Sequence, residues 1–207
     1  MSLNIDISSN IAYHMKNIDN LNKQVFYQSI RHSIGKALGA GQTRATKSLR
    51  ERLNLGKAKD VKKRIRITKP KASSLANLEG IISFDDAPQP LLDFVKGSKN
   101  RIEQKGLTYR KRRVLKIEIT KGKVFKMKGG FIQKVKSTQV FRRGKGGGFY
   151  KQSAPSIAHF IEQEKLKIPV IRRMKDVFRT NLKNQYEYRL ARMAAKSGRN
   201  WNAYKKI

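Results

Sequence analysis

The side chains that could do chemistry are few and widely spaced. The three histidines, His14, His32 and His159, lie far apart, and none belongs to an HExxH or HxH pattern. Zinc sites and general-base pairs need such ligands close together, so these positions favour neither. The sequence contains no cysteine, which excludes disulfides and thiolate metal sites. We therefore predict no catalytic residue, no metal site and no cofactor.

An acidic group interrupts an otherwise basic chain. Residues 73–94 contain Glu79, Asp85, Asp86 and Asp93 and no lysine or arginine. Clustered carboxylates can hold magnesium for nuclease chemistry, which is the enzymatic alternative. The Asp-Asp-Ala-Pro composition of residues 85–88 is instead typical of a turn. We favour a turn, or an acidic patch that meets a basic neighbour, and predict that the protein is not an enzyme.

The glycine-rich run GKGGG at residues 144–148 invites comparison with phosphate-binding loops. No GxxxxGK[ST] pattern occurs in the sequence, and no helix-forming run follows the glycines directly. The run is therefore interpreted as a hairpin tip. Its basic neighbours Arg142, Arg143 and Lys145 could still contact phosphates without regard to sequence.

Positive charge is the strongest signal in the sequence. Lysine and arginine number 48 against 14 acidic residues, which gives a net charge of +34. Such self-repulsion favours nearby anions, and contacts to phosphates would be salt-sensitive and independent of base sequence. The densest clusters, predicted to contact DNA or an acidic partner, are Lys62, Lys63, Arg64 and Arg66, and Arg110, Lys111, Arg112 and Arg113. No base-reading motif accompanies them.

The elements that must position these residues follow from hydrophobic periodicity. Apolar residues at spacings near 3.6 predict helices over residues 19–53 and 169–196. Glycines at positions 39 and 41 suggest either a break between two helices or close approach of a neighbouring subunit. Residues 57–72 form a basic arm, either a short helix or extended. Strands are predicted at residues 78–84, 91–95, 114–119, 124–127, 131–135 and 139–143, with glycine-containing hairpin turns between the later ones.

These elements predict an α+β fold, with an antiparallel β-sheet flanked by a long N-terminal helix and a long C-terminal helix, and with an extended basic arm and loops. Residues 1–207 are expected to form a single domain, with its sheet over residues 78–143. No apolar run reaches the ~20 residues that span a bilayer, so no membrane contact is expected. The first ten residues carry no basic side chain, unlike a secretory signal, which favours the cytoplasm.

The order of these segments resembles the minor tail protein Z family of tailed phages. The resemblance is carried by the long first helix, the basic arm, GGFIQKV at residues 129–135, QVFRR at 139–143, APSIAHFIE at 154–162 and the final helix. It implies a virion structural protein that is assembled in the host cytoplasm. Its expected place is the head-to-tail junction, as a tail-completion or neck component.

The resemblance also implies partners: other tail and neck proteins (tail terminator, tail tube and connector), copies of the same chain in a ring, and phage DNA bound without sequence preference. Residues expected at the subunit interface are Phe26, Ile30, Ile34, Phe131, Ile132, Phe178 and Leu182. The alternative is a ribosome-associated or chromatin-type protein, whose basic residues would serve nucleic-acid binding as the main task.

Overall fold

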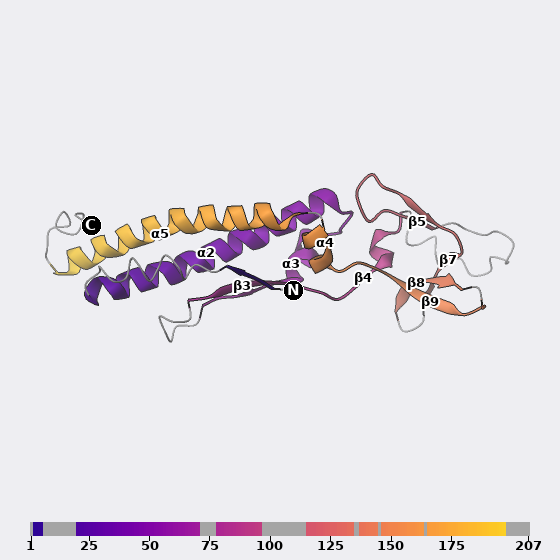
Figure 1. Ribbon diagram of the computed structural model, residues 1–207, viewed down its shortest axis with the longest axis horizontal. Helices are drawn as coiled ribbons and strands as arrows, with labels where there is room; N and C mark the ends of the chain where they lie inside the picture. Colours follow the sequence, from indigo (N-terminus) through magenta and orange to yellow (C-terminus); the bar gives the residue numbers. More distant parts are fainter. Residues whose placement is uncertain are drawn as a thin grey trace. The chain divides into compact units, whose positions relative to one another are not determined.

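The computed structural model describes residues 2–5, 20–70, 78–96, 115–134, 137–144, 146–163 and 165–197. Its helices and antiparallel sheets confirm the predicted α+β class (Figure 1). The chain divides into two compact units, which are described separately. Unit 1 comprises residues 1–45, 65–84 and 167–207, and unit 2 comprises residues 46–64 and 85–166. The expectation of one domain stays a prediction.

The two predicted long helices are present. Helix α2 runs over Asn20–Arg52 and helix α5 over Lys167–Ser197. Pro169 lies in the first turn of α5, where a missing N–H leaves no hydrogen bond unmade. Helix α2 continues without interruption through Gly39 and Gly41, so the predicted break there is wrong.

Within unit 1, α2 and α5 lie against each other in antiparallel order. Near the start of α2, the rings of Phe26 and Tyr186 meet edge to face, with centroids 5.5 Å apart. Further along, a Cβ atom at Gly41 would come within 2.5 Å of Sδ of Met174. Gly41 therefore permits α2 to approach another helix closely. That helix is α5 of the same chain and not part of a neighbouring subunit.

A three-stranded antiparallel sheet completes unit 1, in the order β1-β3-β2. Its strands are β1 (Ser2–Ile5), β2 (Ile65–Thr68) and β3 (Gly80–Phe84). Alternate residues of β3 are buried, as expected when one sheet face is covered. A Cβ atom at Gly80 would lie 2.5 Å from Cγ2 of Ile34, so α2 covers that face at close range. Gln42 also donates from Nε2 to the carbonyl oxygen of Ile65, over 2.7 Å.

Buried polar groups on α2 are satisfied locally. Ser29 and Ser33 are fully buried, and each hydroxyl donates to the carbonyl oxygen one turn earlier, at 2.8 Å and 2.7 Å. Such bonds let a polar side chain lie inside a helix interface without an unpaired donor. The helix therefore buries serine beside Ile30 and Ile34 at no loss of hydrogen bonding.

Unit 2 is rich in strands. A sheet of order β4-β9-β8-β7 is antiparallel throughout, and a separate pair joins β5 to β6. The elements of unit 2 are α3 (Ala58–Lys63), β4 (Gln89–Pro90), the 3-10 helix η2 (Leu91–Phe94), β5 (Leu115–Ile117), β6 (Phe125–Met127), β7 (Gly130–Lys134), β8 (Thr138–Arg143), β9 (Phe149–Ala154) and α4 (Ile157–Gln163). Gly122, Gly129 and Gly147 all have positive φ. The turns at Gly122 and Gly147 join the paired strands β5 and β6 and the paired strands β8 and β9, as predicted for hairpins. Gly129 lies between β6 and β7, which belong to different sheets, so the hairpin predicted there is wrong.

The core of unit 2 is small. Phe94 is fully buried at its centre, together with Ile117 and Val140. Leu91, Met127 and Ala154 complete the cluster, and partly buried side chains such as Ile132 pack around it. One face of the β7-β8-β9 sheet contributes to this core, and its other face does not.

Several segment predictions need correction. Residues 91–94 form a 3-10 helix and not the predicted strand, because Leu91 and Phe94 three residues apart both turn into the core. The basic arm is ordered over residues 58–68 as α3 followed by β2. Strands β1, β4 and β9 were not predicted. Residues 71–72 of the arm lie outside the described part of the chain.

Candidate binding surfaces

Helix α3 presents the first predicted basic cluster of unit 2. Within the helix only Val61 is buried, and it holds α3 to the core while Lys62 and Lys63 are exposed. Arg64 caps the helix, and its N–H bonds to the carbonyl oxygen of Val61. The sequence folds this way because a single apolar residue in a charged segment can be buried only if its neighbours face water. This geometry suits contact with an extended polyanion.

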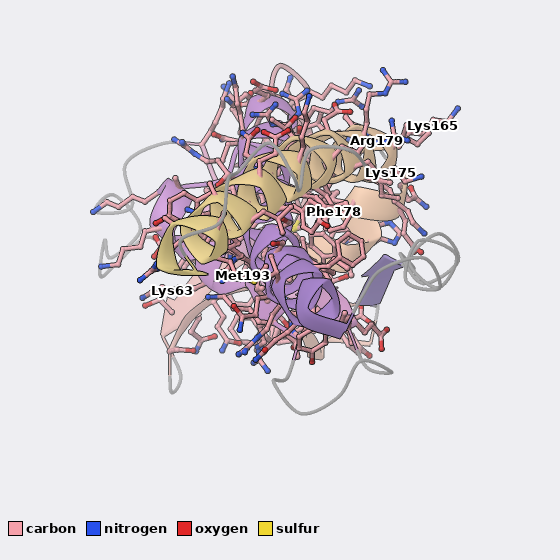
Figure 2. The ribbon with its side chains drawn as sticks, turned by 90° about the vertical axis from the view of Figure 1, so that its left-hand side faces the viewer. Lys63, Lys165, Lys175, Phe178, Arg179 and Met193 are labelled. Atoms are coloured by element: carbon pink, nitrogen blue, oxygen red, sulfur yellow. The ribbon has the colours of Figure 1, made fainter. Side chains whose placement is uncertain are left out.

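Arg66, the fourth residue of that cluster, belongs to unit 1. It is exposed on β2 and pairs with Ser83 of β3, on the sheet face opposite the one that α2 covers. Arg110, Lys111, Arg112, Arg113 and Lys145 lie outside the described residues. Nitrogen-tipped side chains project outward around the ribbon in Figure 2, which displays how widely positive charge is spread.

The outer face of the β7-β8-β9 sheet is aromatic. Phe131 and Phe141 are directly paired across β7 and β8, and their rings stack with centroids 5.9 Å apart. Phe149 of β9 meets Phe131 edge to face at 5.1 Å. Phe149 itself is 54% exposed. Three phenylalanines thus form one partly exposed cluster, which we call the phenylalanine face.

Cations surround the phenylalanine face. Arg143 is paired with Phe149, and its Cζ lies 5.3 Å from that ring's centroid, within the range of a cation–π contact. Lys151 is exposed and is paired with Phe141, so it shares this face. Arg142 lies on the opposite face of β8, because successive strand residues alternate. Of the two adjacent arginines predicted to contact phosphate, Arg143 therefore lies beside the phenylalanine face, whereas Arg142 is paired with Tyr150 on the other face.

Strand β7 is an edge strand. Among the described residues it pairs with β8 alone, so its other side carries no strand partner there. Gly130 to Lys134 thus offers backbone donors and acceptors that can add a further strand. Ile132, predicted to lie at a subunit interface, is partly buried and packs against the core of unit 2, and its place at an interface stays a prediction.

The helical residues predicted at a subunit interface lie within unit 1. Ile30 and Ile34 are 0% and 2% exposed, so they belong to this chain's own core. Phe26 contacts Tyr186 and is half-buried. Phe178, labelled on α5 in Figure 2, and Leu182 are also half-buried. Burial raises the pKa of Tyr186, because the phenolate is harder to hold away from water.

The carboxylates of unit 2 serve its turns. Asp85 accepts a hydrogen bond from the N–H of Ala87 at 3.1 Å, the geometry expected of the predicted turn. Asp86 accepts one from the hydroxyl of Ser156, which also accepts from the N–H of His159 at the start of α4. These bonds tie residues 85–87 to α4, and no group of three or more metal-ligating side chains occurs in the described part of the chain.

Glu118 holds the β5-β6 turn. Its Oε2 lies 2.6 Å from Nζ of Lys96, and its Oε1 accepts from the N–H of Gly122 at 2.7 Å. The pKa of the Glu118 carboxyl is lowered from its ordinary value of 4.5, chiefly by the hydrogen bond from Lys96 and then by that from Gly122. Both bonds favour the charged form, so this carboxylate has a structural role in the turn.

Sequence reasoning missed β9 and with it Phe149 and Lys151. The signal that could have found the strand is the alternation in FYKQSA at residues 149–154, where residues at odd positions share one face. The signal is weak because every residue from Phe149 to Lys151 is exposed, so no apolar–polar contrast marks the strand.

A comparison with protein families decides the identity. The family model described as prophage minor tail protein Z matches residues 11–197. The chain belongs to the minor tail protein Z family. This confirms the resemblance carried by the GGFIQKV, QVFRR and APSIAHFIE segments, and it gives the chain a structural role in a phage tail.

The family assignment also bears on the remaining expectations. Minor tail protein Z is a structural and not an enzymatic family, and a tail protein acts together with other tail proteins in the virion. No helix within the described ranges is long and apolar enough to cross a bilayer. The search of curated proteins and the search of solved structures gave no match.

Proposed function

We propose that this minor tail protein is a tail-completion or neck component at the head-proximal end of the tail, where copies of the chain assemble around or near the DNA channel. The proposal rests on one observation, which is that unit 2 has two different surfaces suited to binding. The phenylalanine face offers apolar area for a protein partner, and α3 offers exposed cations for a polyanion. The family match favours this function over a ribosome-associated or chromatin-type role.

The phenylalanine face is proposed as the contact between copies. When a partner covers a large aromatic side chain that is exposed on a sheet face, the burial lowers the free energy of the complex. Phe149 is 54% exposed and already fixed by Phe131 and Arg143, so little ordering is needed on binding. The edge of β7 that pairs with no strand in the described part of the chain lies beside the same cluster and can extend the contact by backbone hydrogen bonds.

Analytical ultracentrifugation tests this contact with a matched pair of variants. Phe149→Ser removes an exposed ring from the phenylalanine face, and Phe125→Ser removes a 63% exposed ring from β6 that lies outside it. We expect Phe149→Ser to weaken self-association by ~10-fold or more, as loss of a central aromatic contact does. Phe125→Ser should associate like the wild type. Equal self-association of both variants and the wild type would rule out this face.

Non-specific DNA contact is proposed for α3. Each lysine that neutralises a phosphate releases a counterion, so its loss lowers the salt dependence of binding by about 0.9. Lys62→Gln/Lys63→Gln should therefore reduce the slope of log affinity against log salt by up to ~2. The control pair Lys123→Gln/Lys126→Gln removes exposed lysines of the β5-β6 hairpin and should leave the slope nearly unchanged. The reverse pattern would place the DNA elsewhere.

Phage particles assembled with variant proteins test the proposed place of the protein in the tail. Lysates carrying Lys62→Glu/Lys63→Glu should produce tails of normal length that join heads or deliver DNA poorly, because charge reversal repels phosphate. Tails purified from lysates that carry Phe149→Ser should instead lack the protein. Electron microscopy and mass spectrometry of the particles separate the two outcomes. Normal head joining and infectivity with both variants would contradict the proposed role.

A further inference from the structure

A hollow of about 550 Å³ lies in the surface of unit 1, and its lining includes none of the residues predicted to contact DNA. It forms where one stripe of α2, the residue that follows β2 and one residue of α5 come together. The lining residues are Gln28, Arg31, His32, Gly35, Lys36, Lys69 and Arg189. The five from α2 follow the i, i+3, i+4, i+7, i+8 pattern of a single helix face.

The lining carries a concentrated positive charge. Arg31, Lys36, Lys69 and Arg189 are cationic at neutral pH, and the described lining includes no aspartate or glutamate. None of the four takes part in an ion pair among the described residues. Like charges held together across three elements repel one another unless an anion lies between them. This arrangement is therefore most stable with a bound anion.

Arg189 is held in a fixed position at the hollow. Its Nη1 donates to Oε1 of Gln28 over 2.6 Å, which joins α5 to α2. Its Nε is buried and has no acceptor among the described residues. A guanidinium has five N–H donors, and one left buried without an acceptor costs free energy. The side chain is thus ordered in advance and short of acceptors.

Gly35 leaves room in the middle of the α2 stripe. A Cβ atom built at this position would meet no other atom within 4 Å. Arg31 precedes Gly35 by one turn and Lys36 follows it directly, so the space that the missing side chain leaves lies between cations. An oxyanion can approach the helix there without displacing a side chain.

We infer that this hollow is a binding site for a phosphate group that carries more than one negative charge. Four cations from three elements match the charge of a phosphomonoester or pyrophosphate better than that of a single carboxylate, and arginine binds phosphate oxygens in pairs. The phosphate can be a terminal monoester phosphate of a nucleic acid, since an internal phosphodiester carries only one negative charge, or it can belong to a free polyphosphate. The site is independent of the proposed place in the tail, because it uses none of the residues of α3 or the phenylalanine face.

Calorimetry with inorganic pyrophosphate and the full chain tests the site. Lys36→Gln/Lys69→Gln removes two exposed lysines of the lining, and Lys175→Gln/Arg179→Gln removes the same charge from exposed positions of α5 outside it. Figure 2 labels Lys175 and Arg179 on that helix. We expect the first pair to weaken binding by at least ~10-fold and the second by less than ~2-fold, since charge-assisted bonds are lost only in the first. Equal weakening by both pairs, or no pyrophosphate binding by the wild type, overturns the inference.

A second variant tests the same site without removing a cation. Gly35→Glu places a carboxylate among Arg31, Lys36 and Arg189, so it should compete with pyrophosphate, whereas Gly35→Gln adds similar bulk without charge. Pyrophosphate binding should fall by at least ~10-fold more for Gly35→Glu than for Gly35→Gln. Identical binding by the two variants would contradict an anion site.

Competition identifies the source of the phosphate. Duplex DNA with 5′-phosphate ends that displaces pyrophosphate from the wild type, but not from Lys36→Gln/Lys69→Gln, indicates a terminal nucleic-acid phosphate when the same duplex without end phosphates fails to do so. Failure of DNA to displace it indicates a free polyphosphate. Displacement by polyglutamate at lower concentration than by either phosphate ligand would mean that the hollow accepts an acidic peptide, and the inference would be wrong.

Discussion

Unit 1 and unit 2 treat their large apolar side chains differently. In unit 1, Ile30, Ile34 and Leu38 are at most 2% exposed. Its elements approach one another so closely that glycine is needed at positions 41 and 80. Unit 2 leaves the side chains of Phe125, Phe149 and Tyr150 more than half exposed. In unit 1, Ile168 and Tyr188 are exposed to a similar degree. Most apolar residues of unit 1 stabilise its own fold, whereas unit 2 keeps several of them at a surface.

The difference follows from the elements. A long helix can turn one stripe to a sheet and another to a second helix, so α2 buries residues on two sides. A hairpin sheet has two faces, and in unit 2 only one of them contributes to the core. The phenylalanine face is the side that contributes no residue to this core, which is why unit 2 supplies the proposed protein contact.

The largest expected effect comes from emptying the core of unit 2. Phe94→Ala should lower the free energy of unfolding by about 3–5 kcal/mol, because Phe94 is fully buried at the centre of a small cluster. Hydrogen exchange should show the loss of protection in β5, β6 and β8, with α2 residues 25–40 still protected. Equal loss in both units would mean that they unfold together, as the prediction of a single domain implies.

A glycine pair tests the close packing of unit 1. Gly41→Ala should destabilise the protein by roughly 1–3 kcal/mol, since the added methyl meets buried Met174 and Ile82. Gly39→Ala meets nothing within 4 Å and should stabilise it by about 0.5–1 kcal/mol through helix propensity. Chemical denaturation measures both. A stabilising Gly41→Ala would show that the contact between α2 and α5 is looser than described.

The turn at Glu118 should make unit 2 sensitive to acid. The folded-state pKa of Glu118 lies below its ordinary value of 4.5, so its contribution to stability is complete above that pH and is lost as pH falls through the lowered pKa. Glu118→Gln should therefore be less stable than the wild type at pH 7, and the difference should shrink toward pH 3. Thermal melting across this range measures it. A difference that grows on acidification would contradict the described bonds.

The smallest effect is expected at the rim of the phenylalanine face. Arg143→Gln removes the cation beside Phe149 and should reduce stability by about 0.5–1 kcal/mol. Arg142→Gln, one residue away on the other face of β8, is the matched control and should change stability less. Denaturation at low and high salt measures both variants. Indistinguishable variants would remove the argument that Arg143 fixes the exposed ring.

Local pattern was enough to predict the long helices and the hairpins. The apolar repeat from Leu21 to Leu53 gives a helix whether or not its packing is known, and glycines with positive φ mark turns that few other residues can form. Pattern failed at Leu91–Phe94, where the four-residue segment LLDF fits a strand and a 3-10 helix equally well. The alternation of Ile65 and Ile67 was the signal for β2, and the surrounding lysines and arginines obscured it.

The predicted binding residues stay predictions. The sequence drew attention to Lys62 and Lys63 because they are adjacent, and to Arg143 because it neighbours a glycine run. It did not draw attention to Arg31 and Lys36, since each is a single cation on a helix face and lies beside Lys69 and Arg189 only in the folded chain.

By itself, the sequence determined the charge of +34, the two long helices, the hairpins and the family, because each depends on composition or on neighbours along the chain. Only the tertiary structure decided that α2 stays unbroken at Gly41, where Met174 and Ile82 fill the space a side chain would need. The cationic hollow also depends on the tertiary structure, because its lining comes from segments more than 30 residues apart in the sequence. These segments meet only when the helices and the sheet of unit 1 pack around their common core.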